Sequence, residues 1–478
     1  MKNLKSKIIL AIIFLAIAAG IFGAGRYFKV DEAQAAGVTY YVCYDASECN
    51  TAGSFGWSTG KDANSGLSKS SPFLNIQKAA DMVNAGDVVI VGSGTYADTN
   101  ADKYIIKLTK TGNSANWITF KSEHPGGAVI DGENTLGLYG ILLIEGVSYI
   151  RLEGFIIKNC DNGIFANPPE TAPNTNIYVY QCQIFNIARK IFHDSYGRAG
   201  IFTGSYSRNF TVDSCAIHDV GRLPGGNYPD GNDYHDYVHD HGFYAQGAGH
   251  LIKNSIFYNA YAGWNIKIDG YLGEIPATES SIKIINSVFA HAANPFNDPT
   301  IAYHGGLITI YVNPTGYAGL PQNRAKNVVI ENSIFYNPPA PIYGGVSRPN
   351  FAIQTYNLWT TAVFSDTLIR NCVTNGQSLI KMPDGYSVSD LKTYSNNHDA
   401  ATDQTLNDSD LGMIDPENDN FALLSNANYL INKGYSGLGV LATDILNNPR
   451  DSFPDIGAYE YSGDNTTPPS VPAGLSVK

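Results

Sequence analysis

Short alternations of apolar and polar residues, bounded by Gly or Asn, fill most of the chain. The six residues 254–259 (NSIFYN) return unchanged at 332–337, and weaker copies lie around them. The second positions of the seven copies are residues 155, 182, 215, 255, 287, 333 and 372, which are unevenly spaced. A strand-like element that recurs at uneven intervals predicts a solenoid, in which the strands stack while the loops between them vary in length.

The repeat itself indicates how such a stack would be built. Its first position is Gly or Asn in five of the seven copies, and these residues tolerate a left-handed bend. The second and fourth positions share a face at a period of two; the second is mostly Ser or Cys and the fourth is Ile or Phe in six copies. A small residue beside a large one on every turn fills a narrow core. The last position is Asn in four copies, which predicts ladders of amides along the stack.

A second short strand pattern precedes the repeat on each turn and usually begins at Gly. These glycines are Gly140, Gly163, Gly200, Gly242, Gly263 and Gly306. Two strand patterns on each turn, with no helical period between them, predict a parallel β-helix. Over residues 40–460 the pattern resembles the right-handed parallel β-helix proteins of the pectate-lyase-like superfamily. The resemblance implies an all-β, right-handed solenoid, but no single activity.

The two ends of the predicted solenoid have their own signals. Ser71 and Pro72 predict the start of a short helix from Phe73 to about Asn84, which would cover the open end of the stack. Residues 71–96 resemble the opening segment of bacterial β-helix proteins. Residues 454–461 (PDIGAYEY) resemble their closing motif, for which we expect a terminal strand that caps the stack.

The first 35 residues predict export. Lysines at the start precede an apolar run that ends near Ala24, and residues 33–35 (AQA) offer a cleavage site. Arg26 and Lys29 between the run and this site leave an uncleaved membrane anchor as the alternative. We therefore expect a secreted or cell-surface protein.

These signals divide the chain into three parts. Residues 1–35 form the signal peptide or anchor, and residues 37–462 form the β-helix domain. Residues 466–478 resemble the lead-in strand of a fibronectin type III module. Residues 463–478 are accordingly predicted to be a linker and the start of such a module.

The charge restricts the partners. The formal net charge is −12, and removal of residues 1–35, with five basic and two acidic residues, would bring it to about −15. An acidic protein is a poor partner for nucleic acid. The same charge disfavours an acidic polysaccharide unless calcium or a locally basic groove bridges the two. We expect a monomer that acts on a polysaccharide or cell-surface glycan without an organic cofactor.

The six cysteines fall into two groups. Cys43 and Cys49 are close in sequence, and a disulfide between them is predicted for an oxidising compartment. Cys182, Cys215 and Cys372 occupy the small-residue position of the repeat and are predicted to be buried thiols. A disulfide between Cys182 and Cys215 stays open, because adjacent turns lie at the spacing of paired strands. Cys160 has no obvious partner.

Ionisable residues are concentrated on the fourth and fifth Gly-started strands. Alternation at a period of two points Tyr244 and Lys267 outward, and in-register stacking would bring them together. Strict alternation points His241 inward, so its place in the patch assumes that Gly242 bends the chain. The predicted patch consists of His241, Tyr244, Gln246, Asn265, Lys267 and Asp269.

The chemistry that this patch suggests is β-elimination from a uronic-acid polysaccharide. The reaction removes a proton α to a carboxylate, so it needs a base and a positive charge that stabilises the developing enolate. Lys267 is the predicted base, provided that its surroundings favour the neutral amine, and His241 is the competing base. Tyr244 is the predicted donor to the leaving oxygen.

Further residues are assigned to the substrate and to a metal ion. Gln246, Asn265, Asp269 and His239 are predicted to contact the substrate. Arg198 or Arg222 would neutralise its carboxylate. Calcium would serve the same purpose, held by Asp230, Asp233, Asp236 and Asp240 of the insertion at 222–240. The family resemblance implies this too, since many of its lyases combine a Lys or Arg base with calcium or a basic clamp.

Four alternatives remain open. Lys267 and Asp269 could form only a surface ion pair beside a solvated loop, or His235, His239 and His241 could bind a transition metal. A glycoside hydrolase would use two carboxylates from Asp230, Asp233, Asp236, Asp240 and Asp269. A non-catalytic glycan-binding or adhesive surface protein would use exposed aromatic residues such as Phe165, Phe202, Tyr244 and Trp359.

Overall fold

A computed structural model of the chain describes most of residues 37–463. The residues outside the description within this span are 52, 98–101, 136, 190–196, 223–238, 262, 271–278, 292–306, 314–322, 337–350, 358–365, 376–377, 400–407, 437–440 and 462. The predicted signal peptide lies outside the described residues, and so does nearly all of the predicted fibronectin-like start. No helix within the described part is long and apolar enough to cross a membrane.

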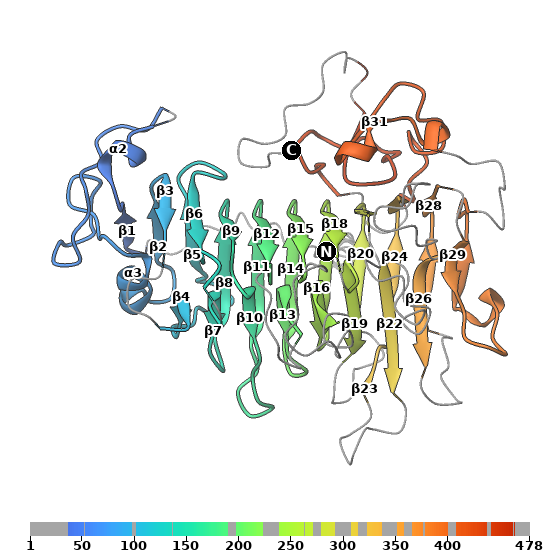
Figure 1. Cartoon of the computed structure of the whole chain (residues 1–478), viewed down its shortest axis with the longest axis horizontal. Helices are drawn as coiled ribbons and strands as arrows, with labels where there is room; N and C mark the ends of the chain where they lie inside the picture. The colour runs from blue at the N-terminus through green and yellow to red at the C-terminus, as the bar shows by residue number, and fades with distance from the viewer. Residues whose placement is uncertain are drawn as a thin grey trace, which may run out of the picture.

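Three parallel sheets run along the molecule, and each turn of the chain adds one strand to each (Figure 1). Sheet A contains β1 (Thr39–Val42), β2 (Val88–Val91), β5 (Ile118–Ser122), β8 (Ser148–Glu153), β11 (Thr175–Tyr180), β14 (Arg208–Asp213), β17 (His250–Lys253), β20 (Ile282–Ile285), β24 (Val329–Glu331), β27 (Leu368–Arg370) and β30 (Thr393–Ser395). Sheet B contains β3 (Gly94–Tyr96), β6 (Ala128–Asp131), β9 (Ile156–Lys158), β12 (Gln183–Ile187), β15 (Ala216–Val220), β18 (Ile256–Ala260), β21 (Val288–Ala290), β25 (Ile334–Tyr336) and β28 (Val373–Thr374).

Sheet C completes each turn. It contains β4 (Tyr104–Leu108), β7 (Tyr139–Leu143), β10 (Asn162–Ala166), β13 (Ala199–Thr203), β16 (His241–Gln246), β19 (Ile266–Gly270), β22 (Ile308–Asn313), β26 (Phe351–Asn357) and β29 (Ser378–Lys381), with the short β23 (Asn323–Arg324) antiparallel to β22. The predicted all-β, right-handed parallel β-helix is confirmed. The prediction of two strands on each turn was wrong, because the strands of sheet A form a third column.

The repeated hexapeptide is the turn from sheet A together with the strand of sheet B. Its first position is left-handed in all seven copies, at Gly154, Gln181, Ser214, Asn254, Asn286, Asn332 and Asn371. This confirms the predicted bend. The large fourth positions stack inside: the rings of Phe257 and Phe289 are 5.5 Å apart, and those of Phe289 and Phe335 are 5.3 Å apart.

The stacked glycines of sheet C are explained by close approach of the backbone. A Cβ atom at Gly163 would lie 2.4 Å from the carbonyl oxygen of Gly200, and one at Gly200 would lie 2.6 Å from that of Gly242. Real Cβ atoms do not come so close to a backbone oxygen, so a side chain here would push adjacent turns apart. The narrow core therefore requires Gly at this corner.

The N-terminal helix α3 (Ile76–Met82) covers the first turn, as predicted (Figure 1). Its Ile76, Ala79 and Ala80 are buried in the main core. The predicted start at Phe73 with Ser71 as the cap was wrong. The backbone of Phe73 pairs with β1, since its N–H donates to the carbonyl of Tyr41, and the helix can begin only after this bridge ends.

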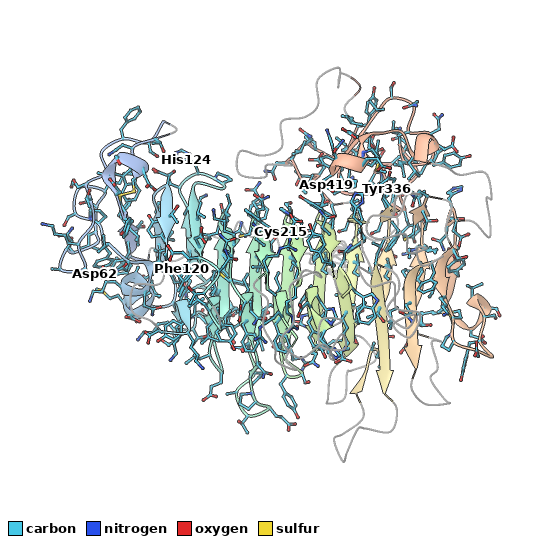
Figure 2. The ribbon with its side chains drawn as sticks, viewed as in Figure 1. Asp62, Phe120, His124, Cys215, Tyr336 and Asp419 are labelled. Carbon is cyan, nitrogen blue, oxygen red and sulfur yellow. A yellow bond between two sulfur atoms is a disulfide. The ribbon has the colours of Figure 1, made fainter. Side chains whose placement is uncertain are left out.

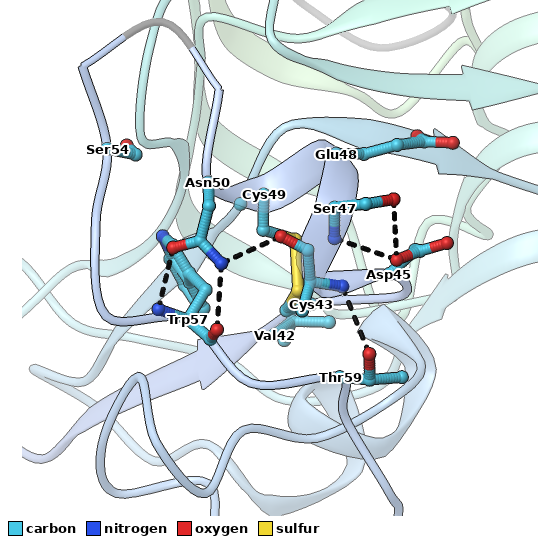
Figure 3. Close-up of a disulfide and its surroundings, with 12 residues drawn as sticks. Val42, Cys43, Asp45, Ser47, Glu48, Cys49, Asn50, Ser54, Trp57 and Thr59 are labelled. Atoms are coloured by element: carbon cyan, nitrogen blue, oxygen red, sulfur yellow. Dashed lines mark hydrogen bonds between the residues drawn. A yellow bond between two sulfur atoms is a disulfide. The ribbon is translucent and has the colours of Figure 1, made fainter.

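The predicted disulfide between Cys43 and Cys49 is confirmed (Figure 3). It closes a loop around α2 (Ala46–Cys49), where the Asn50 amide donates to the carbonyls of Ala46 and Trp57 at 2.7 and 2.8 Å. The other four cysteines are buried and free, so no bond joins Cys182 to Cys215. Burial raises the pKa of the Cys372 thiol to about 12, which keeps it unreactive.

The C-terminal segment, residues 408–461, lies along the outer side of sheet B (Figure 1). It contains η5 (Asp408–Leu411), β31 (Met413–Asp415), η6 (Pro416–Asn418) and β32 (Asn420–Leu423), and a short η4 (Val388–Asp390) precedes it. Its apolar residues pack on the outward side chains of β18, β21, β25 and β28. The expected terminal strand capping the stack was wrong, because the closing motif packs on the side of the stack.

The asparagines at the first position of the repeat hold this segment in place. Asn254, Asn286, Asn332 and Asn371 donate to the carbonyls of Thr443, Asp455, Tyr435 and Lys433 at 2.8, 2.9, 3.2 and 2.7 Å. The earlier copies carry Gly, Gln or Ser at this position, although the C-terminal segment also reaches the turn of Gln181, where the Tyr180 hydroxyl donates to Asn447 at 3.0 Å. Amide contacts along the stack also occur, as from Asn159 to Asp131 at 2.8 Å, so the predicted ladder is present only in part.

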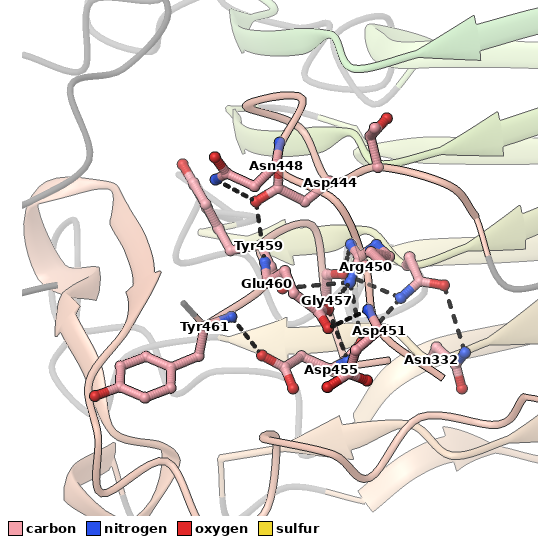
Figure 4. Close-up of polar contacts among 12 residues, drawn as sticks. Asn332, Asp444, Asn448, Arg450, Asp451, Asp455, Gly457, Tyr459, Glu460 and Tyr461 are labelled. Carbon is pink, nitrogen blue, oxygen red and sulfur yellow. Dashed lines mark hydrogen bonds and ion pairs between the residues drawn. The ribbon is translucent and has the colours of Figure 1, made fainter. Parts of the chain in front are cut away.

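A buried arginine joins the closing motif to the same asparagine column (Figure 4). Arg450 bonds Glu460 at 2.8 Å, the carbonyl of Gly457 at 2.9 Å and the Asn254 side chain at 3.2 Å. Gly457 lies so close to β25 that a Cβ atom there would meet Ile334 at 2.5 Å. The closing motif therefore binds the side of the later turns and holds the C-terminal segment on sheet B.

Asp419 lies in the C-terminal segment beside Tyr336 of sheet B (Figure 2), and its carboxyl is expected to make stability depend on pH. Burial, followed by the charges of Asp219 and Asp415, raises the pKa of the Asp419 carboxyl from its ordinary 3.8 to about 7; His291 also faces it at 3.3 Å. The folded state holds this proton more tightly than the unfolded chain does. The protonated Asp419 therefore contributes to the free energy of unfolding below pH 3.8, its ordinary pKa, and this contribution is lost as the pH rises through about 7.

We expect Asp419→Asn to stabilise the fold by about 1–3 kcal/mol at about pH 8 and to change it little at about pH 4. Thermal unfolding at the two pH values measures this. Asp384→Asn, at an exposed position, is the control and should change neither midpoint. An equal effect of Asp419→Asn at both pH values would contradict the assignment.

Candidate active site

The outward side chains of sheet C form one continuous row, called the outward column below. Adjacent strands pair in register, and each member lies between residues whose side chains point into the core. The column is Lys107, Leu142, Phe165, Phe202, Tyr244, Lys267, Thr309, Gln354 and Lys381. Tyr244 and Lys267 are direct neighbours, as predicted from the sequence.

Four of the predicted patch residues form one hydrogen-bonded group. The Tyr244 hydroxyl donates to the Asp269 carboxylate at 2.7 Å and accepts from the Lys267 amine at 3.2 Å. The Gln246 amide donates to Asp269 at 2.8 Å and to the Tyr244 oxygen at 3.2 Å. The phenol thus links a cation and a carboxylate, and the amide holds both oxygen atoms in place.

A local irregularity of the strands brings Asp269 into this group. The pairing of β16 and β19 shifts after Ala245, so that Gln246 pairs with Gly270 and Asp269 becomes the extra residue of a bulge. A bulge turns a side chain away from the direction that regular pairing would give it. Asp269 is consequently buried against Tyr244, although Lys267 beside it remains partly exposed.

Three polar oxygen atoms near Lys267 are buried without a partner. They are Oδ1 of Asp269, Oγ1 of Thr309 and Oε1 of Gln354, and none has a hydrogen-bond partner among the described residues. Buried polar atoms in native proteins nearly always have a partner, so three of them in one region indicate a polar ligand or bound water. Thr309 was missed in the sequence, since the pattern was aligned on Gly306 and pointed Ile308 and Ile310 outward.

His241 supports this group from behind. Its side chain is fully buried, and the centre of its ring lies 5.3 Å from the ring centres of both Tyr244 and Trp264. Its Nδ1 accepts a hydrogen bond from the backbone N–H of Trp264 at 3.2 Å. The assumed bend at Gly242 was wrong, because Gly242 does not have a left-handed conformation. Glycine is required at this position for another reason: a Cβ atom would lie 2.5 Å from the Asn265 carbonyl oxygen. His241 is therefore placed to orient Tyr244.

Asn265 does not belong to the outward patch. It lies in the turn before β19, where alternation does not hold, and it is buried. Its amide donates to the carbonyls of Phe257 and Ala290 at 3.1 and 2.9 Å. Asn265 thus closes the corner between sheets B and C, and its assignment to the substrate was wrong.

Arg222 and Asp240 form a buried ion pair, and neither matches its predicted role. Arg222 Nε and Nη2 each bond one oxygen of Asp240 at 2.8 Å, and the backbone N–H groups of Arg222 and Arg198 donate to the same carboxylate at 3.0 Å. Arg222 is 1% exposed and Asp240 is 0% exposed. The pair joins the two ends of the insertion to each other directly before β16. Because both side chains are buried and bonded to each other, Arg222 cannot neutralise a substrate and Asp240 cannot bind calcium.

The remaining predicted residues lie around this core. Arg198 is partly buried, with its Nε 3.4 Å from Asp161, and His239 is exposed. The other predicted residues of the insertion, which are Asp230, Asp233, His235 and Asp236, fall outside the described residues. Within the described part, no three His, Cys, Asp or Glu side chains are arranged to hold a metal ion. The described residues do not form a calcium site.

Comparisons with known proteins agree with the fold. A family model for proteins of unknown function (DUF1565) matches residues 58–274. The structure is similar to the crystal structure of pectate lyase Pel9A, with a TM-score of 0.51 and 17% identity over 88% of this chain and 96% of that one. It also matches an alginate lyase from Paenibacillus sp. str. FPU-7, with a TM-score of 0.39 and 12% identity over 68% of this chain and 96% of that one.

A comparison with curated protein sequences found no match. The likeness to pectate lyase Pel9A shows a shared parallel β-helix fold, which agrees with the three sheets described above. At this identity it shows the fold alone. The chemistry has to be argued from the side chains.

Proposed function

We propose that this protein is a carbohydrate-active enzyme that cleaves a uronic-acid-containing polysaccharide by β-elimination at the outward column around Lys267. The main support is the group of Lys267, Tyr244 and Asp269, which places a partly exposed amine 3.2 Å from a phenol oxygen. The fold shared with a pectate lyase and the predicted export signal fit an extracellular polysaccharide as substrate.

The proposed reaction uses three side chains. Lys267, as the uncharged amine, takes the proton from the carbon α to the uronate carboxylate. The electron pair of that C–H bond forms a C=C bond as the C–O bond to the leaving sugar breaks. Tyr244 donates its proton to the departing oxygen, and Asp269 and Gln246 hold the phenol in position. The product is an oligosaccharide with an unsaturated terminal sugar.

The developing negative charge on the substrate needs a counter-charge. Of the two predicted arginines, Arg222 is excluded by its buried pair with Asp240, and Arg198 could serve only by exchanging its ion pair with Asp161 for the uronate carboxylate. Calcium bound by Asp230, Asp233 and Asp236 stays part of this proposal as the second source of positive charge. A chelator tests that part separately.

The glycoside hydrolase alternative has less support. It needs two carboxylates on opposite sides of the glycosidic bond, one of which must be free to act as an acid. Asp240 is occupied by Arg222, which leaves Asp269 as the one candidate carboxylate among the described residues. The elimination mechanism requires no second carboxylate.

A panel of acidic and neutral polysaccharides, with and without a chelator, tests the proposed function. We expect the ultraviolet absorbance of the new C=C bond to rise with at least one uronate polysaccharide and with no neutral one. Reducing ends that appear without this absorbance would indicate a hydrolase. Binding without cleavage of any polysaccharide would indicate an adhesive protein and would overturn the enzymatic assignment.

A further inference from the structure

The outward column carries no charged side chain between Lys107 and Lys267. Four positions separate Lys107 from Lys267, and they are occupied by Leu142, Phe165, Phe202 and Tyr244. None of them is basic. A ligand that extends from Lys267 in this direction meets no positive charge in the column for four turns.

The exposed surface of these turns is apolar. The rings of Phe165 and Phe202 are 4.7 Å apart with planes 14° apart, so they stack along the axis of the β-helix and present their edges outward. Both are partly exposed. Tyr139 continues the row at 4.7 Å from Phe165, and Tyr244 ends it at 5.2 Å from Phe202, nearly perpendicular. The result is an apolar strip that leads directly to the proposed active site.

Among the described residues, the charged side chains next to Phe165 and Phe202 do not favour a carboxylate either, and Lys103 and Lys107 lie beyond Leu142 at the far end of the strip. Glu145 and Glu170, which follow β7 and β10, are both exposed. Arg198, at the start of β13, is paired with Asp161. On the opposite side of Lys267 the column is polar, since Thr309 and Gln354 carry unpartnered oxygen atoms and Lys381 lies beyond them.

Adjacent turns of a β-helix are separated by about 4.8 Å, close to the length of one sugar residue in an extended glycan. A glycan lying along the column would thus place about one sugar on each turn. A polymer made only of uronates would set carboxylates against the apolar strip, where removing them from water without a counter-charge is unfavourable.

From these observations, and resting on the proposed function, we infer that the substrate carries a uronate at Lys267 and uncharged sugars over Phe202 and Phe165. The substrate class is a heteropolysaccharide in which uronic acid and neutral sugars share one backbone. The acidic net charge of −12 agrees with this, because such a chain carries fewer carboxylates than a polyuronate of the same length.

The test compares purified full-length protein on a homopolymeric uronate and on a backbone in which uronate alternates with a neutral sugar. We expect kcat/KM for the alternating polymer to be at least about tenfold higher. Phe202→Lys, which adds a cation to the strip, should raise the relative rate on the homopolymer several-fold. Phe202→Leu keeps the strip apolar and should retain the wild-type preference. Phe185→Lys is the control, since Phe185 occupies an equivalent stacked position on sheet B.

The outcomes separate this inference from the function on which it rests. Equal or faster cleavage of the homopolymer by the wild-type protein overturns the inference and leaves the lyase assignment standing. The same conclusion follows if Phe202→Lys folds and its preference is unchanged. Absence of unsaturated product from every substrate refutes the lyase assignment, and the inference falls with it.

Discussion

Replacing Lys267 with alanine is expected to reduce β-elimination about 10²–10⁴-fold, the usual contribution of a positioned base. The fold should survive, because Lys267 is partly exposed and the isoleucines on either side of it carry the packing. Release of unsaturated oligosaccharide measures the activity, and thermal unfolding measures the fold. Lys267→Met, which keeps a long side chain but has no amine, should be equally inactive.

Two controls make this result specific. Lys283→Ala removes a lysine from an outward position of sheet A, between two core isoleucines, and should keep the wild-type rate. The second control is thermal unfolding of Lys267→Ala, whose midpoint should stay close to that of the wild type. A folded Lys267→Ala protein with wild-type activity would show that the outward column is not the active site.

The fold was predictable because the residues of the repeat determine the position of the turn and of the strand that follows it. A left-handed first position, a small second residue and a large fourth residue define a turn and a strand in most copies, and the left-handed first position holds in all seven. Sheet A was missed because its strands run into the repeat with only a short turn between them. In the turn that contains β8 and β9, residues 154 and 155 alone separate the two strands, so the pair is read as one stretch.

The site was predictable where strands are regular and unpredictable at their ends. Period-two alternation correctly brought Tyr244 and Lys267 together. It failed for Asn265, which lies in a turn, where local backbone direction decides the side of the sheet. For His241 the error was the assumed bend at Gly242, since alternation without a bend points this residue inward and the structure buries it. A sequence pattern also cannot show that Asp240 has Arg222 as its partner, because an insertion of variable length separates them.

The C-terminal segment shows a signal that the sequence contained but that was not used. Asn occupies the first position of the repeat only from Asn254 onward, and each of these asparagines donates to a backbone carbonyl of residues 433–455. Where Asn replaces Gly in a left-handed turn, its side chain can bond to an additional element. The switch from Gly, Gln and Ser to Asn thus marks the turns whose first position bonds directly to the C-terminal segment.

Neutralising Asp240 is expected to have the second large effect, this time on stability. Asp240→Asn removes the carboxylate that Arg222 Nε and Nη2 bond in the interior, and breaking a buried pair in this way costs about 3–5 kcal/mol. Activity should fall as well, because Asp240 directly precedes His241, whose ring supports Tyr244. Denaturant-induced unfolding measures the loss of stability, and kcat/KM on the cleaved polysaccharide measures the loss of activity.

A second substitution separates the charge from the hydrogen bonds. Asn at position 240 has one side-chain oxygen, so it can accept only one of the two backbone N–H groups, those of Arg198 and Arg222, that the two carboxylate oxygens accept. Adding Arg222→Met removes the cation that faced the carboxylate. The double variant should therefore recover part of the lost stability, since replacing both members of a buried ion pair costs less than removing one. If Arg222→Met instead lowers stability further in the Asp240→Asn background, the pair does not hold the insertion to β16. His241 and Tyr244 would then owe their positions to the packing of Trp264.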